Sequence, residues 1–289
     1  STKVLTTCNA PEEGVLDGVR TLVADAQAKL SNLRTFIYGT TLATNALIGR
    51  TGARTAFVTT AGFRDTIEMR TESRFEQYDL NLQLPPPLVQ RKDRFPLAER
   101  IAADGTVLRP FDDDAARALI EHLGHRPDGE DYQAVAVGFI HSYVNDDHER
   151  RFRDLLLQEL PDMSVSISSE VSPQMREFER FNTVCANAYV QPLMGSHLRN
   201  LEQQLHAAGA ACPVYLMHSG GGLIDIETAA RFPVRLVESG PAGGAIFAAD
   251  IADRHGLGAV LSYDMGGTTA KVCLIEDGSP RTARTFEVA

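Results

Sequence analysis

The stretch "SYDMGGTTAKVCLIEDG", Ser262 to Gly278, has the pattern of an apolar strand, a turn of two glycines and two threonines, a second apolar strand and an Asp-Gly turn. A hairpin that only reverses the chain is well served by a tip such as Asp277-Gly278. At the first turn, Gly266 and Gly267 would let successive backbone N–H groups converge on an anion. Asp264 stands at the mouth of that turn. The first turn therefore carries more chemistry than chain reversal requires.

The Gly-Gly-Thr-Thr turn predicts a phosphate cradle, in which Thr268 and Thr269 add hydroxyl donors. Asp264 would then face the bound phosphates, where a carboxylate can hold a magnesium-bound water or orient an attacking one. The alternative is a tight hairpin whose aspartate accepts from its own turn. For an isolated Gly-Gly-Thr this alternative is favoured, so the neighbouring motifs have to decide.

Two further glycine-rich stretches precede the hairpin. In "ESGPAGGAIFAADIA", Pro241 marks a helix start, and Gly243 and Gly244 fall in its first turns. Glycine costs about 1 kcal/mol in a helix interior, so two of them indicate close approach of another group to that helix. Close packing of the helix on a strand is the alternative. "HSGGGLID", residues 218–225, is favoured as a plain flexible turn.

Composition excludes several classes of protein. The 289 residues are 43% hydrophobic and 23% charged, as in an ordinary globular protein. A net charge of −10 without a basic block argues against a nucleic-acid partner. The widely spaced Cys8, Cys185, Cys212 and Cys273 indicate free thiols of a reducing compartment. No apolar run is long enough to span a membrane, and no signal-peptide pattern occurs, so the cytoplasm is the expected location.

Alternating strand and helix patterns predict a layered α/β protein. We expect a hairpin around Asp104-Gly105, an extended linker with the triplet "PPP" over 74–87, and a helical region over 173–208 that bends at Pro192. The other strands are expected at 35–38, 54–60, 134–140, 164–168, 214–217, 234–240 and 259–265. The other helices are expected at 12–30, 42–51, 61–69, 112–124, 145–160 (capped by Asn145), 225–232 and 241–256.

The order of the motifs adds a resemblance to a known family. The stretch from Val234 to Ile275 resembles the joint between the two halves of an actin-like ATPase. "GTTLATNAL", "VTTAGFRDTIEMR", "NAYVQP", "SGGG", "SGPAGG" and "DMGGTT", in this order, resemble the hydantoinase A and 5-oxoprolinase family, which also supplies subunits of ATP-dependent acetone and acetophenone carboxylases. The resemblance implies an α/β, actin-like ATPase (ribonuclease H-like) fold, incomplete in this chain, with an inserted α/β region.

The resemblance also implies a nucleotide site with ATP and Mg²⁺. Magnesium would be held by Asp264 through water. The implied nucleotide-binding residues are Gly266, Gly267, Thr268, Thr269, Gly240, Gly243, Gly244, Gly39, Thr40 and Thr41, with Thr44 and Asn45 opening the helix after the last three. Many relatives have Thr-Asp where this chain has Ala270-Lys271, so Lys271 either meets phosphate or solvates the other face of its strand.

The resemblance divides the chain into four stretches. Residues 1–75 would begin the N-terminal nucleotide-binding half, 76–212 would be the insertion, 213–257 would complete the first half, and 258–289 would begin the second half. Relatives usually carry a first phosphate hairpin before a strand such as "KVLTT", and an adenine-binding turn well after the second hairpin. Neither is present, so the chain is expected to be part of a longer protein, and these 289 residues alone are expected to fold without hydrolysing ATP.

The activity that the resemblance implies is ATP-dependent ring opening of a cyclic amide of the hydantoin or 5-oxoproline type, through phosphorylation of the carbonyl oxygen. The alternatives are a carboxylase subunit that activates its substrate by phosphorylation, and a noncatalytic nucleotide-sensing subunit. A partner subunit of the hydantoinase B type is implied, and neither nucleic acid nor membrane is an expected partner.

Side chains outside the glycine-rich turns give weaker signals. Glu68, Arg70 and Arg74 could line a substrate cleft, although a solvated helix end is the favoured interpretation. His141 and His218 each end an apolar strand, where ligands bind in α/β sheets, but a structural role is favoured for both. The run "REFERF", 176–181, is most simply a salt-bridged helix face.

Overall fold

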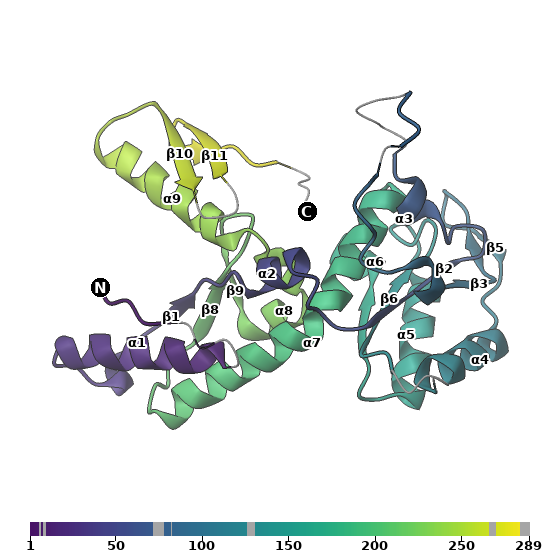
Figure 1. The fold of residues 1–289 in the computed structure, drawn as a ribbon, viewed down its shortest axis with the longest axis horizontal. Helices are drawn as coiled ribbons and strands as arrows, with labels where there is room; N and C mark the ends of the chain where they lie inside the picture. Colours follow the sequence, from purple (N-terminus) through teal and green to yellow (C-terminus); the bar gives the residue numbers. More distant parts are fainter. Residues whose placement is uncertain are drawn as a thin grey trace. The chain divides into compact units, whose positions relative to one another are not determined.

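The computed structural model describes residues 1–5, 7, 10–71, 78–81, 83–125, 131–265 and 270–283, and Figure 1 traces the chain. The chain forms two compact units. Unit 1 comprises Ser1–Ile48 and Leu193–Val288, and unit 2 comprises Gly49–Pro192. Each unit contains its own sheet, as expected of an α/β protein. The division into four functional stretches remains a prediction.

Unit 2 is built on a parallel sheet with the strand order β3-β2-β6-β7. Every residue of β2 and β6 is buried, which is typical of central strands covered on both faces. The register pairs Val58 with Phe95 on one side and with Val137 on the other. The strands are β2 (Thr55–Thr60), β3 (Arg94–Leu97), β6 (Ala134–Gly138) and β7 (Ser164–Ile167).

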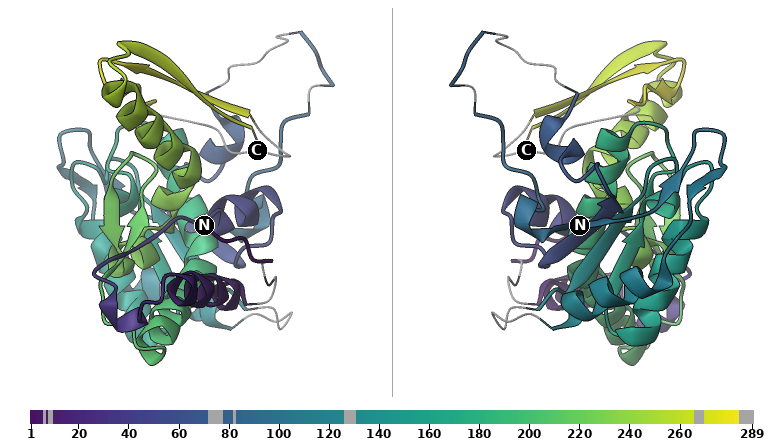
Figure 2. Two further views of the ribbon diagram at one scale, coloured as in Figure 1. Left: turned by 90° about the vertical axis from the view of Figure 1, so that its left-hand side faces the viewer. Right: turned by 90° about the vertical axis from the view of Figure 1, so that its right-hand side faces the viewer.

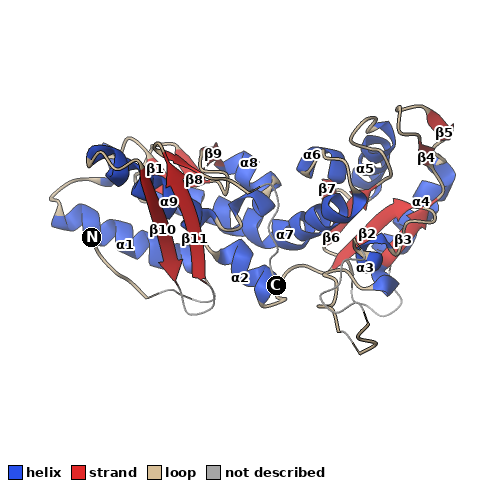
Figure 3. Ribbon diagram, turned by 90° about the horizontal axis from the view of Figure 1, so that it is seen from above, coloured by secondary structure: helices blue, strands red, loops and turns tan. Residues whose placement is uncertain are grey.

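Helices cover both faces of this sheet. On one face, α4 (Asp113–Gly124) and α5 (Asp147–Glu159) contribute core side chains that pack with Val58 and Val137. On the other face, Phe181 of α7 (Glu177–Ala207) packs on Phe57 of β2, with ring centroids 5.2 Å apart. Figure 3 colours these helices blue and the strands red.

Short elements complete unit 2: α3 (Thr66–Met69), α6 (Ser168–Val171), the 3-10 turn η2 (Arg91–Asp93), β4 (Arg100–Ile101) and β5 (Val107–Arg109). The expected hairpin around Asp104-Gly105 is present between β4 and β5, with Gly105 at φ +87°. The segment Arg94–Leu97 lies outside it, because it pairs in parallel with β2 as strand β3.

Unit 1 contains a sheet with the order β1-β8-β9. Strand β1 (Phe36–Tyr38) runs parallel to β8 (Val214–Met217), and β9 (Leu223–Asp225) returns antiparallel to β8. Apolar side chains of α1 (Pro11–Asp25), α7 and α8 (Ile226–Arg231) join the core on one face of this sheet. The remaining helical elements are η1 (Leu30–Asn32), α2 (Leu42–Ile48) and η3 (Pro233–Leu236).

The last part of unit 1 is α9 (Ser239–Arg254) followed by a hairpin of β10 (Ala259–Met265) and β11 (Ala270–Glu276), with the short β12 (Ser279–Pro280) at its edge. The two antiparallel strands agree with the hairpin predicted from the sequence, and their register pairs Ala259 with Glu276 and Met265 with Ala270. The hairpin packs along α9, and both views of Figure 2 show it in yellow beside that helix.

Several local predictions differ from the structure; among them, the helices expected at 42–51 and 61–69 are shorter, at Leu42–Ile48 and Thr66–Met69. The first helix ends at Asp25 instead of Leu30, because Gln27 takes a left-handed conformation with φ +52°. The segment 234–240 is not a strand: Pro233, which lacks an N–H, opens a 3-10 turn, and α9 starts already at Ser239. Helix α5 has Asp146 at its N-cap position without a side-chain cap bond, and the expected capping by Asn145 is present in that Asn145 Oδ1 accepts from the backbone N–H of Asp147 at 3.1 Å. Helix α7 continues through Pro192, and a bend there remains a prediction.

Candidate functional site

The Gly-Thr-Thr loop follows the carboxyl end of β1. The backbone N–H of Leu42 donates to Thr40 Oγ1 at 3.1 Å, and the backbone N–H of Asn45 donates to the carbonyl of Thr41 at 2.8 Å. These bonds hold the loop against the first turn of α2. Because β1 and β8 are parallel, this loop and the loop after β8 lie at the same edge of the sheet, which is where ligands bind in α/β folds.

The amino end of α9 lies against this loop. Ser239 Oγ donates to the carbonyl of Thr40 at 3.4 Å, and the backbone N–H of Glu238 donates to Thr44 Oγ1 at 3.3 Å. Glu238 has φ +65°, a left-handed conformation uncommon for a residue with a side chain. A helix amino end carries unsatisfied N–H groups and a partial positive charge, so it favours anions.

The glycines of α9 differ in their surroundings. A Cβ built on Gly240 or Gly244 meets nothing within 4 Å among the described residues, whereas one on Gly243 meets Met217 Cε at 3.6 Å. Among the described residues, the only group close to either glycine is the Met217 side chain beside Gly243, and the expected close approach of another group to Gly244 stays a prediction. Gly240 and Gly244, four residues apart, leave an open strip on one face of the helix.

The β10–β11 hairpin brings its acidic residue to the α9 side. Asp264 pairs directly with Lys271, so both side chains stand on one face of the hairpin. The ammonium of Lys271 forms an ion pair with Glu238, the residue that precedes α9. Burial lowers the pKa of Lys271. Lys271 is thus engaged by a carboxylate, which is neither of the two roles considered from the sequence. The predicted phosphate residues Gly266, Gly267, Thr268 and Thr269 lie outside the described residues.

His218 lies in the loop after β8. Its ring Nδ1 accepts from the backbone N–H of Gly220 at 2.8 Å, and the backbone N–H of His218 donates to the carbonyl of Gly222 at 2.8 Å. Burial and the nearby Arg235 lower the pKa of this imidazole. The ring therefore organises the turn, which agrees with the structural role favoured from the sequence.

In unit 2, the side chains suggested for a substrate cleft have structural partners. Glu68 forms an ion pair with the buried Arg94 at 2.9 Å, and Arg70 Nη2 donates to the carbonyl of Pro85 at 2.5 Å. Arg74 lies outside the described residues. His141 has φ +60° and a lowered pKa caused by burial, and its buried Nδ1 has no hydrogen-bond partner among the described residues.

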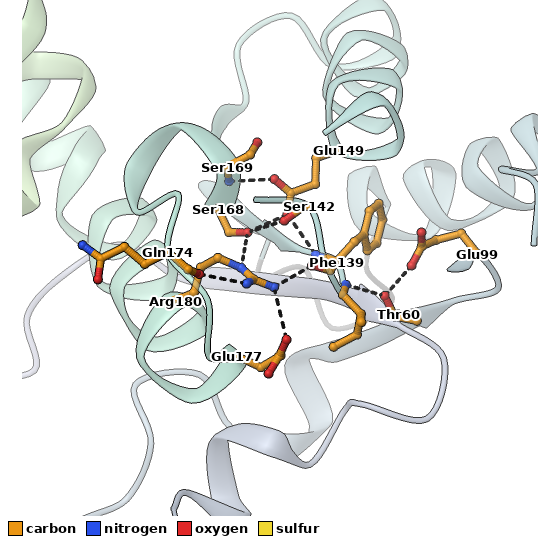
Figure 4. Close-up of polar contacts among 11 residues, drawn as sticks. Thr60, Glu99, Phe139, Ser142, Glu149, Ser168, Ser169, Gln174, Glu177 and Arg180 are labelled. Carbon is orange, nitrogen blue, oxygen red and sulfur yellow. Dashed lines mark hydrogen bonds and ion pairs between the residues drawn. The ribbon is translucent and has the colours of Figure 1, made fainter. Parts of the chain in front are cut away.

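The run 176–181 does not form a solvated ion-pair face, because Arg180 is fully buried. Its guanidinium donates to Ser168 Oγ at 3.1 Å and to the carbonyls of Gln174 and Phe139 at 3.1 and 2.8 Å (Figure 4). A buried cation needs such hydrogen-bond partners. Most of the partners of Arg180 are backbone carbonyl groups, which no local sequence pattern reveals.

The same cluster contains a buried carboxylate, Glu149. It accepts from the backbone N–H groups of Phe139 and Ser169 at 2.9 Å each and from Ser168 Oγ at 2.6 Å (Figure 4). Burial raises the pKa of Glu149. Together Glu149 and Arg180 fix the segment after β6 to the end of β7. The sequence did not single out Glu149, since an acidic residue in the first turn of a helix normally signals only a favourable helix dipole.

Two absences concern the described part of the chain only. No group of three or more His, Cys, Asp or Glu side chains there is arranged to hold a metal ion. Among the same residues, no helix has both the length and the apolar character that crossing a membrane demands.

Sequence comparison with known proteins covers nearly the whole chain. Residues 1–160 match the model of the hydantoinase/oxoprolinase N-terminal region, and residues 180–289 match the hydantoinase/oxoprolinase model. Caprolactamase subunit alpha of Pseudomonas jessenii is 34% identical over 84% of this chain and 34% of its own length. The 5-oxoprolinase of Saccharomyces cerevisiae is 30% identical over 94% of this chain and 23% of its own length.

Solved structures give the same answer for the fold. The crystal structure of ATP-dependent caprolactamase from Pseudomonas jessenii has a TM-score of 0.83 at 30% identity, and the nucleotide-free structure of acetone carboxylase has a TM-score of 0.80 at 26% identity. Each covers 94% of this chain, which spans 40% of each solved chain. The chain spans 34% or less of the length of the two curated relatives named here. With its α/β fold of the actin-like ATPase type, this chain belongs to the hydantoinase/oxoprolinase family.

Proposed function

We propose that unit 1 forms part of a Mg-ATP site and that the protein uses ATP to open a cyclic amide. The observation that carries this proposal is the convergence of three motifs far apart in the sequence. Thr40 of the Gly-Thr-Thr loop accepts from Ser239 at the start of α9, and Glu238 pairs with Lys271 of the hairpin that bears Asp264. A helix amino end and glycine-rich turns both present backbone N–H groups that favour phosphate.

The surroundings of α9 suit a polyphosphate. The open strip over Gly240 and Gly244 would let an anion approach the helix backbone at a place where a side chain would stand in its way. Residues 266–269, which lie outside the described part of the chain, would supply further N–H and hydroxyl donors. Pre-positioned donors of this kind stabilise the charge that develops on a transferred phosphoryl group.

Asp264 fits a magnesium ion. Mg²⁺ keeps several of its waters and is usually held by one or two carboxylates together with substrate phosphates, so a cluster of protein ligands is not required. Asp264 is an exposed carboxylate at the end of β10, on the same face as the α9 contact. When bound, magnesium would neutralise charge on the phosphates, and Asp264 would hold one of its waters.

The chemistry explains why ATP is needed. A five-membered lactam or hydantoin is a poor electrophile. Attack of its carbonyl oxygen on the γ-phosphorus, with release of ADP, gives an imidate-like phosphate whose carbon water can attack. The ring C–N bond then breaks as the nitrogen takes up a proton, and a second water releases phosphate from the resulting acyl phosphate.

Activation for carboxylation is the second candidate, and the similarity to the acetone carboxylase structure favours it. There, phosphorylation would activate an enol or bicarbonate instead of an amide. A nucleotide-sensing subunit without turnover would share the fold as well.

Several relatives are named as subunits, including caprolactamase subunit alpha and acetone carboxylase beta subunit. We therefore also propose a partner subunit, of the hydantoinase B type, and a cytoplasmic location.

Substrate-dependent release of ADP tests these alternatives. The full-length protein, with and without its partner subunit, is incubated with Mg-ATP and 5-oxoproline, hydantoin or caprolactam, and in parallel with acetone and bicarbonate. ADP release that requires a cyclic amide and yields the ring-opened acid supports the proposal. ADP release only with acetone and bicarbonate supports the carboxylase. Nucleotide binding without turnover on any of these substrates contradicts both enzymatic functions.

A further inference from the structure

A buried guanidinium in unit 2 has too few partners for its N–H groups. Arg94 is the first residue of β3, and its side chain is 0% exposed. Its Nε donates to the carbonyl of Val89 at 3.0 Å, and its Nη1 donates to Glu68 at 2.9 Å and to the carbonyl of Arg64 at 3.5 Å. Nη2 is buried as well and has no hydrogen-bond partner among the described residues. An unpaired donor of a buried cation is costly, so this nitrogen calls for an explanation.

The ion pair between Arg94 and Glu68 uses only part of the guanidinium fork. A carboxylate that matches an arginine places one oxygen on each of two nitrogens. Here Oε2 of Glu68 contacts Nη1, while Nη2 stays unpaired within the described part of the chain. The Glu68 side chain is 48% exposed. Glu68 therefore reaches the buried cation from the solvent side and through a single oxygen.

The two members of this pair differ in how firmly the backbone holds them. Arg94 belongs to β3, which pairs in parallel with β2 in the buried sheet of unit 2. Glu68 belongs to α3, which has four residues and ends at Arg70 with a left-handed φ of +56°. So short a helix has few hydrogen bonds of its own. The cation is thus fixed, whereas the carboxylate can turn out to solvent without disturbing the sheet.

Positive charge is in excess around this pair. Nε of Arg64 is buried and lacks a hydrogen-bond partner among the described residues. Arg70 donates to a backbone carbonyl, and no carboxylate in the described ranges forms an ion pair with either arginine. Asp65 accepts two hydrogen bonds from Arg91, at 2.8 and 3.1 Å, which hold the pKa of Asp65 below its usual value. Both nearby acids are therefore already paired, although the whole chain carries a net charge of −10.

We propose that Arg94 binds the carboxylate of a small organic ligand and that Glu68 takes the place of this ligand when it is absent. The two oxygens of the ligand accept from Nη1 and Nη2, and Arg64, whose carbonyl contacts Nη1, adds positive charge. The ligand is a carboxylate because the group that now pairs with the cation is one, and because a planar fork of N–H groups matches a planar anion. The site lies within unit 2 and does not depend on the nucleotide site proposed for unit 1.

Binding of a carboxylate by the full-length protein in the absence of nucleotide tests this site. The probes are 5-oxoproline, 2-pyrrolidinone, which has the same ring without the carboxylate, and inorganic phosphate. Isothermal titration calorimetry measures each Kd. 5-Oxoproline should bind more tightly than the other two. Equal binding of both ring compounds, or binding of phosphate alone, overturns the assignment. Since no nucleotide is present, failure of the proposed nucleotide site would leave this result unaffected.

Glu68→Gln separates a ligand site from a structural ion pair. Glutamine keeps the length of the side chain and an oxygen that can accept from Nη1, but it loses the competing charge. The Kd of 5-oxoproline should therefore fall about three- to tenfold, and the ligand should raise the midpoint of thermal unfolding more in the variant than in the wild type. A variant that binds 5-oxoproline no more tightly than the wild type shows a purely structural ion pair and overturns the proposal.

Asp65→Asn is the matched control, because it removes a carboxylate three residues away from an ion pair in which both side chains are exposed. It should leave the Kd of 5-oxoproline unchanged, and an equal gain in affinity would show a general effect of charge and overturn the site. If Glu68→Gln does not fold, Glu68→Asp replaces it. Aspartate keeps the charge but is one methylene too short to reach Arg94, so it should tighten binding as well, and unchanged binding overturns the proposal.

Discussion

Replacing Gly244 by alanine separates the stability of α9 from ligand binding by it. Gly244 is the sixth residue of a 16-residue helix, and a Cβ at this position meets nothing within 4 Å among the described residues. Because alanine is favoured over glycine by about 1 kcal/mol in a helix interior, Gly244→Ala should raise the free energy of unfolding by up to about that amount.

The same methyl group would occupy the open strip that we assign to the nucleotide. Overpacking of a closely fitted contact costs about 1–3 kcal/mol, so the Kd of Mg-ATP should rise about five- to 150-fold in the full-length protein. Urea unfolding measures the first effect and isothermal titration calorimetry the second. The expected result is a more stable protein that binds more weakly.

A matched control is Gly195→Ala in α7, where the new Cβ would meet only the mobile end of Arg199 at 3.3 Å. It should change stability without changing the Kd. A Gly244→Ala protein that is more stable and binds Mg-ATP as tightly as the wild type would refute the assignment of this strip to the nucleotide.

Three further predictions address the metal, the packing of unit 2 and the acid dependence of unit 1. Asp264→Asn should abolish substrate-dependent ADP release in the full-length protein while leaving its circular dichroism unchanged, because asparagine keeps the shape of the side chain and loses its charge. Undiminished ADP release would rule out the role of Asp264 in holding magnesium. Gly52→Ala should lower the free energy of unfolding by about 1–3 kcal/mol or more, because its Cβ would lie 2.2 Å from the Tyr189 ring and 2.6 Å from the Tyr189 carbonyl oxygen. That oxygen also accepts a hydrogen bond from the backbone N–H of Ala53. An unfolding curve equal to that of the wild type would contradict this prediction. The pKa of Glu12 is lowered from its ordinary value of 4.5. The stability that its carboxylate contributes is therefore present above about that pH and is lost as the pH falls through the folded-state pKa. The difference in unfolding free energy between wild type and Glu12→Gln should be present at pH 7 and shrink below pH 4.5, whereas a difference that grows on acidification would show the opposite shift.

Local sequence patterns predicted the elements that build the candidate site. The structure contains the Gly-Thr-Thr loop between a strand and a helix, the helix that begins near Pro241, and the antiparallel pair β10–β11. Each follows from periodicity and turn chemistry within a short window. Such elements are specified locally, so they can be recognised without knowing the tertiary contacts. The segment 234–240 was misread because its alternating apolar residues imitate a strand, while Pro233 instead starts a 3-10 turn.

The contacts between distant segments could not be predicted. His197 and Glu12 are 185 positions apart, and Arg180 finds its partners in backbone carbonyls and a serine. No spacing rule connects such residues. The glycines of α9 illustrate the same limit, since the sequence indicated that something must come close to them, and only the structure distinguishes the contact with Met217 from the open strip over Gly240 and Gly244.

Hydrogen–deuterium exchange of the full-length protein with and without Mg-ATP, or a nonhydrolysable analogue, tests the central claim most directly. The account predicts slower exchange at residues 39–41, at the amino end of α9 over 240–244, and in the hairpin over 264–271, with the Asp264→Asn protein showing a weaker effect. Protection confined to unit 2, or no protection in these three segments at saturating nucleotide, would contradict the proposed site.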